Sequence, residues 1–363
     1  MHTNKKTPFS QGLQDKIALL SERRTPVRLG GVDFNSPLLL APMSQICSAP
    51  FRLLMEELGA GGTVSELISC HGINYGNQRT REMLRIDERE ECIGIQLFGE
   101  EENAMAQAAL VAQEFAPKFI DINMGCPVRK VVSKGGGSAL LKETAKLGHF
   151  FKTIKSALEV PLTIKIRTGW DDQNLNAEEV IHIAREEGVE FVAIHGRTRT
   201  QQYTGHANWE YLEHIASLAP LPVIGNGDLH SAKATKNRLH QTRCQALMLG
   251  RGPLRDPFIF LKAFEDYQDE VIFTPRDYLE VIDRLVGYME GYTDRERTLL
   301  IQMRKHIMWF AAGFGKAGPF RNSLFAAKTL EETLKLTRDY FLSLGEDDKD
   351  LDLQEEFMTS GHG

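Results

Sequence analysis

Cysteine pairs at metal-binding or redox spacing are absent from this chain. Its five cysteines are an odd number, and no two of them are spaced as C-x-x-C; they are Cys47, Cys70, Cys92, Cys126 and Cys244. This pattern argues against a disulfide framework and a structural zinc site, and we expect no bound metal. Unpaired thiols are typical of a reducing compartment, so the sequence predicts a cytoplasmic protein.

A hydrophobic leader and a long apolar run are also absent. The first residues are polar, so we expect no signal peptide, and no run is long enough to span a membrane. The 363 residues carry a formal net charge of −6, which gives no overall field to attract nucleic acid. A nucleic-acid-binding face would therefore have to be local.

Short apolar runs alternate with amphipathic helical stretches along most of the chain. The runs that read as buried strands are residues 37–41, 62–65, 92–97, 119–123, 162–167, 191–195, 223–226 and 246–250. Helical patterns lie between them at 50–58, 104–115, 177–187 and 209–216. Eight such units predict an α/β fold, and they favour a (β/α)₈ TIM barrel over an open doubly wound sheet.

The pattern changes towards the C-terminus, where strand-like alternation ends. We expect helices around residues 278–288, 295–311, 321–327 and 330–344. The predicted organisation is a polar N-terminal extension (1–27) with a possible short helix over 14–23, a barrel (28–268), a small all-α domain (272–345) and an acidic, disordered tail (346–363). Nothing in the sequence requires an oligomer.

A thiol follows the fourth predicted strand. Asn123 and Cys126 stand in the loop after this strand, and the glycine run 135–137 comes shortly after. A cysteine in this position suggests a catalytic acid or nucleophile on a mobile loop. A buried structural cysteine is the alternative, because free cysteine is among the most buried residue types.

The loops after the seventh and eighth strands resemble a phosphate-binding arrangement. Barrels often hold phosphate there, and Gly225, Gly227, Gly250 and Gly252 would let backbone N–H groups approach an anion closely. Arg251 would add charge. The alternative is that these glycines only make tight turns.

Two cations share one face of the fifth strand. Alternation places Lys165 and Arg167 together, and partly buried cations need a partner. A phosphorylated, electron-rich ring system would be one; internal pairing with Asp121 or Glu66 is the alternative. His195 at the next strand end favours a binding role over a structural one, and the Gln96 amide could bond a heteroaromatic ring or merely cap a loop.

Together these segments resemble the tRNA-dihydrouridine synthases, most closely the bacterial B-type. The resemblance covers about residues 28–345. The matching segments are Ala41 to Met43, Thr63 to Glu66, Gln96, Asp121 to Pro127, Gly137 to Leu141, Lys165 to Trp170, His195 to Thr198, Asn226 to Asp228, and Gly250 with Arg251.

The resemblance implies an FMN-binding barrel, a helical domain that holds tRNA, and reduction of the C5=C6 bond of D-loop uridines with electrons from NADPH. It implies Cys126 as the proton donor to C5. It implies FMN contacts from Ala41, Pro42, Met43, Gln96, Lys165, His195, Asn226, Gly227, Asp228, Gly250 and Arg251. Asn123 is expected to face the uracil, with Arg167 and Arg197 also on the substrate side.

A local basic surface is present in the C-terminal helices. No Asp or Glu occurs between residues 297 and 330, and Arg304, Lys305 and Arg321 lie in that span. These three residues are expected to contact RNA phosphates, although scattered Lys and Arg are more often a solvated helix face. Two other functions remain open from the sequence: an FMN barrel that acts on a free pyrimidine, such as a dihydroorotate dehydrogenase, and an RNA-binding protein with a structural flavin.

Overall fold

The protein forms a closed barrel of eight parallel strands, which confirms the predicted fold class. The computed structural model describes residues 8–265 and 271–345. The barrel strands are β3 (Leu38–Leu40), β4 (Gly62–Val64), β6 (Ile93–Phe98), β7 (Phe119–Met124), β8 (Leu162–Arg167), β9 (Val192–His195), β10 (Val223–Asn226) and β11 (Ala246–Leu249). Pairing runs β4-β3-β11-β10-β9-β8-β7-β6, and the β4–β6 pairing closes the ring. A short extra strand, β5 (Ile68–Ser69), pairs with the end of β6.

Successive side chains of the strands point alternately to the surrounding helices and into the barrel. In β7, Ile120 and Ile122 pack in the outer core between sheet and helices, whereas Phe119 belongs to the inner core. Because side chains alternate along a strand, Asp121 and Asn123 also face inward. The sequence of β7 therefore directs polar groups into the barrel above an apolar base.

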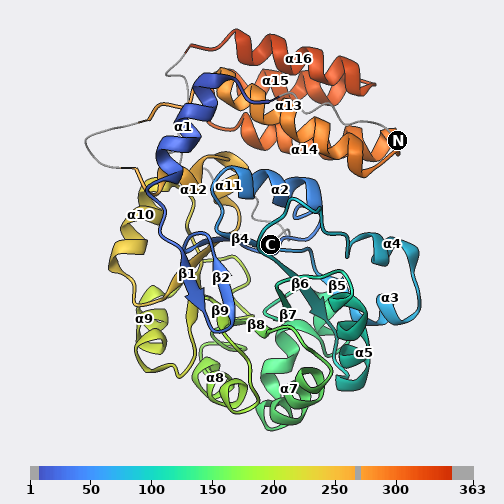
Figure 1. Ribbon diagram of the computed structural model, residues 1–363, viewed down its shortest axis with the longest axis vertical. Helices are drawn as coiled ribbons and strands as arrows, with labels where there is room; N and C mark the ends of the chain where they lie inside the picture. Colours follow the sequence, from blue (N-terminus) through green and yellow to red (C-terminus); the bar gives the residue numbers. More distant parts are fainter. Residues whose placement is uncertain (1–7, 266–270, 346–363) are drawn as a thin grey trace.

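Helices cover the outside of the barrel (Figure 1). The longer ones are α2 (Ala49–Glu57), α5 (Glu102–Gln113), α7 (Leu147–Ser156), α8 (Ala177–Glu186), α9 (Trp209–Leu218) and α10 (Ala232–Gln241). Shorter ones are α3 (Cys70–Asn74), α4 (Gln78–Glu82), α6 (Arg129–Val132), η1 (Gly137–Lys142), η2 (Thr144–Lys146), α11 (Gly252–Arg255) and α12 (Ile259–Lys262). In α8 the buried Val180, Ile181 and Ala184 form the apolar stripe that seats the helix.

A small hairpin that the sequence analysis did not anticipate closes the amino-terminal end of the barrel. Its strands are β1 (Val27–Leu29) and β2 (Val32–Phe34), paired antiparallel. Phe34 packs edge-on against Phe119 and Phe191, with ring centroids 6.0 and 5.8 Å away. Such edge-to-face contacts are favourable for aromatic rings, and they fill this end of the barrel with an apolar base.

Four helices form the C-terminal region and lie together on one side of the barrel, next to α2, α11 and α12 (Figure 1). They are α13 (Pro275–Tyr292), α14 (Glu296–Phe310), α15 (Ala317–Ala326) and α16 (Leu330–Leu342). Their core is continuous with that of the barrel helices, because Phe51 of α2 and Tyr278 of α13 belong to one buried cluster. Arg284 of α13 also bonds both oxygens of Glu57 of α2, at 3.0 and 3.1 Å.

The N-terminal segment packs on the body of the protein. Its helix α1 (Gln11–Ser21) begins three residues before the predicted one, and Leu13 and Leu20 are fully buried. Lys16 forms a 2.7 Å ion pair with Asp277 at the start of α13. The acidic tail predicted for 346–363 lies outside the described residues. No helix in the described part of the chain combines the length and hydrophobicity that crossing a bilayer requires.

Candidate active site

A cavity opens at the carboxyl ends of the barrel strands, where the chemistry of such barrels is found. Together with its open mouth, it comprises about 740 Å³ of space between the atoms. It is lined by Ala41, Pro42, Met43, Leu67, Asn123, Gly125, Cys126, Lys165, Arg167, His195, Tyr203, Asn226, Gly227, Asp228, Leu229, His230, Met248, Gly250 and Arg251. Of the barrel residues expected at the site, Gln96, Arg197, Gly225 and Gly252 are not in this lining.

Cys126 lies in the turn that follows β7, at the wall of the cavity, and is 9% exposed. Its backbone N–H donates to Asn123 Oδ1 at 2.9 Å, and its carbonyl accepts from the Ser138 hydroxyl at 2.9 Å. A Cβ on Gly137 would stand 2.9 Å from that same carbonyl, so glycine is needed there for close approach. Within the glycine run, which was expected to form part of a mobile loop, Gly137 packs against the cysteine turn, whereas Gly135 and Gly136 lie beside Glu100 and Gly99.

The Cys126 thiol holds its proton more firmly than an ordinary cysteine. Burial raises its pKa, while the Val128 N–H and the charges of Arg167 and Lys165 act in the opposite direction. Cations this close stabilise a thiolate once it forms. The thiol is therefore protonated at neutral pH and can release its proton into the cavity.

Lys165 and Arg167 project from β8 into the cavity, as alternation predicted. Lys165 Nζ donates to Asn226 Oδ1 at 3.1 Å, and burial, followed by repulsion from Arg167, lowers its pKa to about 8. Arg167 is 2% exposed and donates to the backbone carbonyls of Gly125, Thr198 and Gln202 at 2.8 to 2.9 Å. Arg167, at the end of β8, thereby ties the loop after β7 to the loop after β9.

A second charged group surrounds Asp228, in the loop after β10. Burial alone would raise the pKa of this carboxyl, but hydrogen bonds from His230, the Ala207 N–H and Arg197 hold it well below its usual range. Arg197 stands 2.8 Å from Asp228 and is itself 2% exposed. Its guanidinium also bonds the carbonyls of Thr204 and Gly205. Arg197 therefore lies beside the cavity, bound to protein groups.

His195 is held in its neutral form beside these cations. Burial and then the charges of Arg167, Lys165, Arg197 and Arg251 lower its pKa well below the ordinary value. Its ring Nε2 lies 3.3 Å from Arg197. A neutral imidazole whose ring faces the cavity can exchange hydrogen bonds with a ligand without adding charge.

Gln96 lies below the cavity floor and is fully buried. Its side-chain amide donates to Asp121 at 2.7 Å and accepts from Asn123 at 2.9 Å. Both ends of the amide are thus occupied by protein groups.

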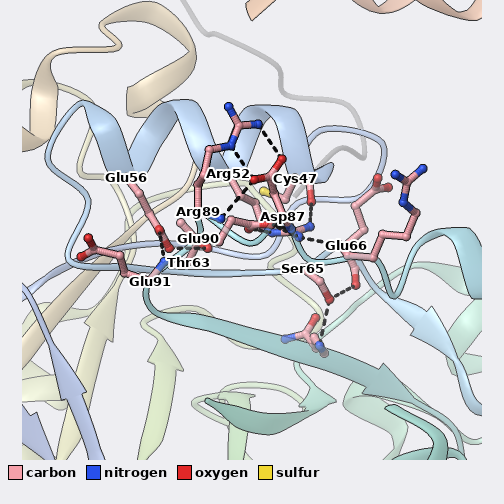
Figure 2. A network of polar contacts seen from close by, with 12 residues as sticks. Cys47, Arg52, Glu56, Thr63, Ser65, Glu66, Asp87, Arg89, Glu90 and Glu91 are labelled. Atoms are coloured by element: carbon pink, nitrogen blue, oxygen red, sulfur yellow. Dashed lines mark hydrogen bonds and ion pairs between the residues drawn. The ribbon is translucent and has the colours of Figure 1, made fainter. Parts of the chain in front are cut away.

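Figure 2 shows a second polar network, between α2 and the loops around it. Arg52 bonds both oxygens of Glu90, at 2.7 and 3.0 Å, as well as the carbonyls of Cys47 and Arg85. Ser65 in the same network accepts a hydrogen bond from the backbone of Gln96 at 2.9 Å. This network fixes the loops after β3 and β4, which carry the apolar wall of the cavity.

The helical region reaches the rim through this network. Glu66 accepts a hydrogen bond from the backbone N–H of Gln45, and Lys305 of α14 lies 3.5 Å from the Gln45 side-chain oxygen. Arg304 instead bonds the carbonyl of Ala327 between α15 and α16, and Arg321 is exposed on α15. Of the three expected RNA contacts, Lys305 therefore reaches the loop after β3, two residues beyond Met43 of the lining.

Sequence reasoning did not single out several lining residues, among them Tyr203 and His230. Tyr203 lies between two cations, with Arg167 and Arg251 5.6 and 5.7 Å from its ring centre. Both residues occupy loops that follow barrel strands. Treating these loops as wholly site-forming would have included them.

Comparison with known proteins places the chain in a family. The model of the dihydrouridine synthase (Dus) family matches residues 39–344. The chain is 33% identical to tRNA-dihydrouridine synthase B of Xanthomonas campestris over 321 residues, which is 88% of this chain and 96% of that protein. It is 34% identical to the enzyme of the same name from Pseudomonas putida, over 87% of this chain and 94% of that one.

Solved structures support the fold alone. The histamine dehydrogenase from Rhizobium sp. 4-9 superimposes with a TM-score of 0.52 at 14% sequence identity, over 74% of this chain. This chain spans about half of that protein, 51% of its length. The sequence relatives carry the assignment: the chain belongs to the dihydrouridine synthase family.

Proposed function

We propose that this protein is a tRNA-dihydrouridine synthase that binds FMN, takes electrons from NADPH and reduces the C5=C6 bond of uridines in the D-loop of tRNA. The family match extends through the helical region, to residue 344. A flavin barrel acting on a free pyrimidine, the rival drawn from the sequence, would have no need of that region. The five cysteines are all free thiols, which fits the cytoplasmic setting proposed from the sequence.

The lining of the cavity supports the choice of flavin mononucleotide as the cofactor. Ala41, Pro42, Met43 and Met248 offer apolar surface for a flat ring. The charged lining residues are Lys165, Arg167 and Arg251 against the single acid Asp228, so the cavity favours an anion. We assign the phosphate to the end formed by Gly250, Arg251 and the turn from Asn226 to Asp228, and the ring edge to Lys165.

The proposed chemistry adds a hydride and a proton across one double bond. When bound and reduced, FMN supplies the hydride to C6 of the uracil. Cys126 gives its proton to C5, and the raised pKa keeps that proton on the sulfur until it is needed. Lys165 and Arg167 then stabilise the thiolate that remains.

RNA recognition is assigned to the helical region and the cavity rim. Lys305 lies beside Gln45, in the loop after β3, and Arg321 is exposed on α15. Both lie in the stretch of sequence without acidic residues, which suits phosphate contacts. Lys305 also lies near Glu66 of the barrel, where burial raises the pKa of that carboxyl and the charge of Lys305 opposes the rise. We propose that Asn123, in the lining, faces the uracil. Arg167 would lie behind Asn123, and Arg197 would act through the loop after β9.

The observation that carries the proposal is a protonated thiol in the wall of a cation-lined barrel cavity, in a chain of this family. The test is the Cys126→Ala variant, which should bind FMN and tRNA like wild type and lose at least about 100-fold in single-turnover dihydrouridine formation. Cys244→Ala is the matched control, because Cys244 is equally buried and does not line the cavity. Unchanged product formation by Cys126→Ala would refute the assignment of the proton donor.

A further inference from the structure

A layer of three polar side chains lies beneath the cavity, inside the barrel. Gln96, Asp121 and Thr163 come from neighbouring strands and are paired by register. Their exposed fractions are 0, 3 and 0%. A carboxyl group buried this deeply needs a reason, because its burial is costly unless its oxygens are satisfied.

Both oxygens of Asp121 are satisfied by neutral donors. One accepts from the Thr163 hydroxyl and the other from the Gln96 amide, each at 2.7 Å. Burial raises the pKa of Asp121 to about 6, while these two bonds and Lys165 oppose the shift. The group is therefore mostly an acceptor at neutral pH.

The hydrogen bonds above Asp121 have only one consistent direction. The backbone N–H groups of Cys126 and Gly125 can only donate, so the Asn123 oxygen must face them, at 2.9 and 3.3 Å. The Asn123 amide NH₂ must then donate to the Gln96 oxygen, which leaves the Gln96 NH₂ directed at Asp121. The ionised carboxyl at the bottom can only accept, and the backbone N–H groups at the top can only donate, so the two ends of the chain of bonds agree.

We propose that Asp121 is a positioning residue for Cys126: through Gln96 and Asn123 it fixes the turn that carries the thiol. The chain of bonds, Asp121–Gln96–Asn123–Cys126, is called the relay below. Asp121 does not line the cavity, so it acts through its neighbours and touches no ligand. The inference rests on the proposed function, since it concerns the placement of the proton donor for that reaction.

Two substitutions at Asp121 separate its hydrogen bonding from its charge. Asp121→Asn keeps an acceptor for Gln96 and can turn its NH₂ to the Thr163 hydroxyl, so the relay persists. Asp121→Leu removes the acceptor and leaves the Gln96 NH₂ unpaired. The assay is single-turnover oxidation of the NADPH-reduced holoenzyme by tRNA at pH 6.5. We expect the rate of Asp121→Asn to lie within about threefold of the wild-type rate. The rate of Asp121→Leu should be lower by about 10- to 100-fold, as for a misplaced reacting group.

Thr163→Val is the matched control. It removes a hydrogen bond to the same carboxyl at an equally buried site, but Thr163 stands outside the relay. Its single-turnover rate should remain within about threefold of wild type even if its stability falls. An equal loss of rate in Thr163→Val and Asp121→Leu would reduce Asp121 to a general stabilising role and overturn the proposal.

A double-mutant cycle tests whether the relay acts as a unit. Gln96→Leu breaks the next link, so the double variant Asp121→Leu/Gln96→Leu should lose no more rate than either single variant. The rate at which iodoacetamide alkylates Cys126 in RNA-free holoenzyme should differ from the wild-type rate by at least threefold in both single variants. In Thr163→Val this rate should equal that of wild type. If Asp121→Leu fails to fold, Gln96→Leu alone must show both the slower single turnover and the altered alkylation rate. Its FMN absorbance and its reduction by NADPH must then equal those of wild type.

The outcomes also separate this inference from the proposed function. Additive losses in the cycle, or a wild-type rate in Asp121→Leu, overturn the role of Asp121 while wild-type protein still makes dihydrouridine. A wild-type protein that forms no dihydrouridine on tRNA overturns the proposed function itself.

Discussion

Glu56 is a carboxyl group that the fold buries at a cost, and its removal should stabilise the protein in a pH-dependent way. Glu56 lies in α2, within the network of Figure 2. It accepts from the Glu91 N–H at 2.7 Å and from the Thr63 hydroxyl at 3.3 Å. Burial, with a smaller contribution from the nearby Glu90, raises its pKa from 4.5 to about 7.

The direction of the effect follows from proton linkage. Between pH 4.5 and about 7 the folded protein retains a proton on Glu56 that the unfolded chain has released, so folding weakens as pH rises through this window. The difference corresponds to about 3 kcal/mol at most, fully expressed above pH 7 and absent below 4.5. Glu56→Gln cannot titrate, and its amide can still accept from the Glu91 N–H while donating to Thr63.

Urea unfolding of wild type and Glu56→Gln at several pH values between 4.5 and 8 measures this effect. We expect the two proteins to converge at the acidic end and the variant to gain up to about 3 kcal/mol at pH 8. Glu88→Gln, at an exposed position in the loop between α4 and β6, is the control, and its stability should follow that of wild type at every pH. A stability difference that does not change with pH would refute the reasoning.

Two further predictions concern the proposed reaction. Lys305→Ala combined with Arg321→Ala should weaken tRNA binding and reduce the salt slope of log Kd by up to about 2, with FMN content unchanged; an unaltered slope would remove both residues from the interface. Arg304 is left intact, because it holds the Ala327 carbonyl. Wild-type single-turnover rates should fall as pH rises past about 8, where Lys165 loses its proton. Lys165→Arg should keep its single-turnover rate to higher pH, because arginine stays protonated. Identical pH–rate profiles for wild type and Lys165→Arg would exclude a role for the charge of Lys165.

The barrel could be predicted because its signal is repeated and local. Every expected barrel strand is present, with bounds that differ by a few residues at most, since each is a short apolar run between turn residues. The carboxyl ends of the parallel strands meet at one rim. The residues that follow each strand in the sequence therefore include most of the residues that line the cavity. Asn123, Lys165 and His195 reached the lining by this argument.

What the sequence did not reveal depends on contacts between distant segments. The strands of the β1–β2 hairpin are three residues each, too short for a periodic pattern, and the role of Phe34 appears only beside Phe119. The amide of Gln96 and the guanidinium of Arg197 looked free to bind a ligand. Gln96 is bonded by Asp121, 25 residues further along the chain, and Arg197 by Asp228, 31 residues further along. These pairs come close only because their strands are neighbours in the barrel.

The aromatic base of the barrel has a consequence for turnover. With Phe34, Phe119 and Phe191 packed across the amino end, the cavity is reached from the opposite end. In the proposed reaction, the nicotinamide donor and the extruded nucleobase would therefore enter the cavity from the same end and occupy it in turn. A cavity with a single open end therefore predicts ping-pong (substituted-enzyme) steady-state kinetics for the proposed reaction.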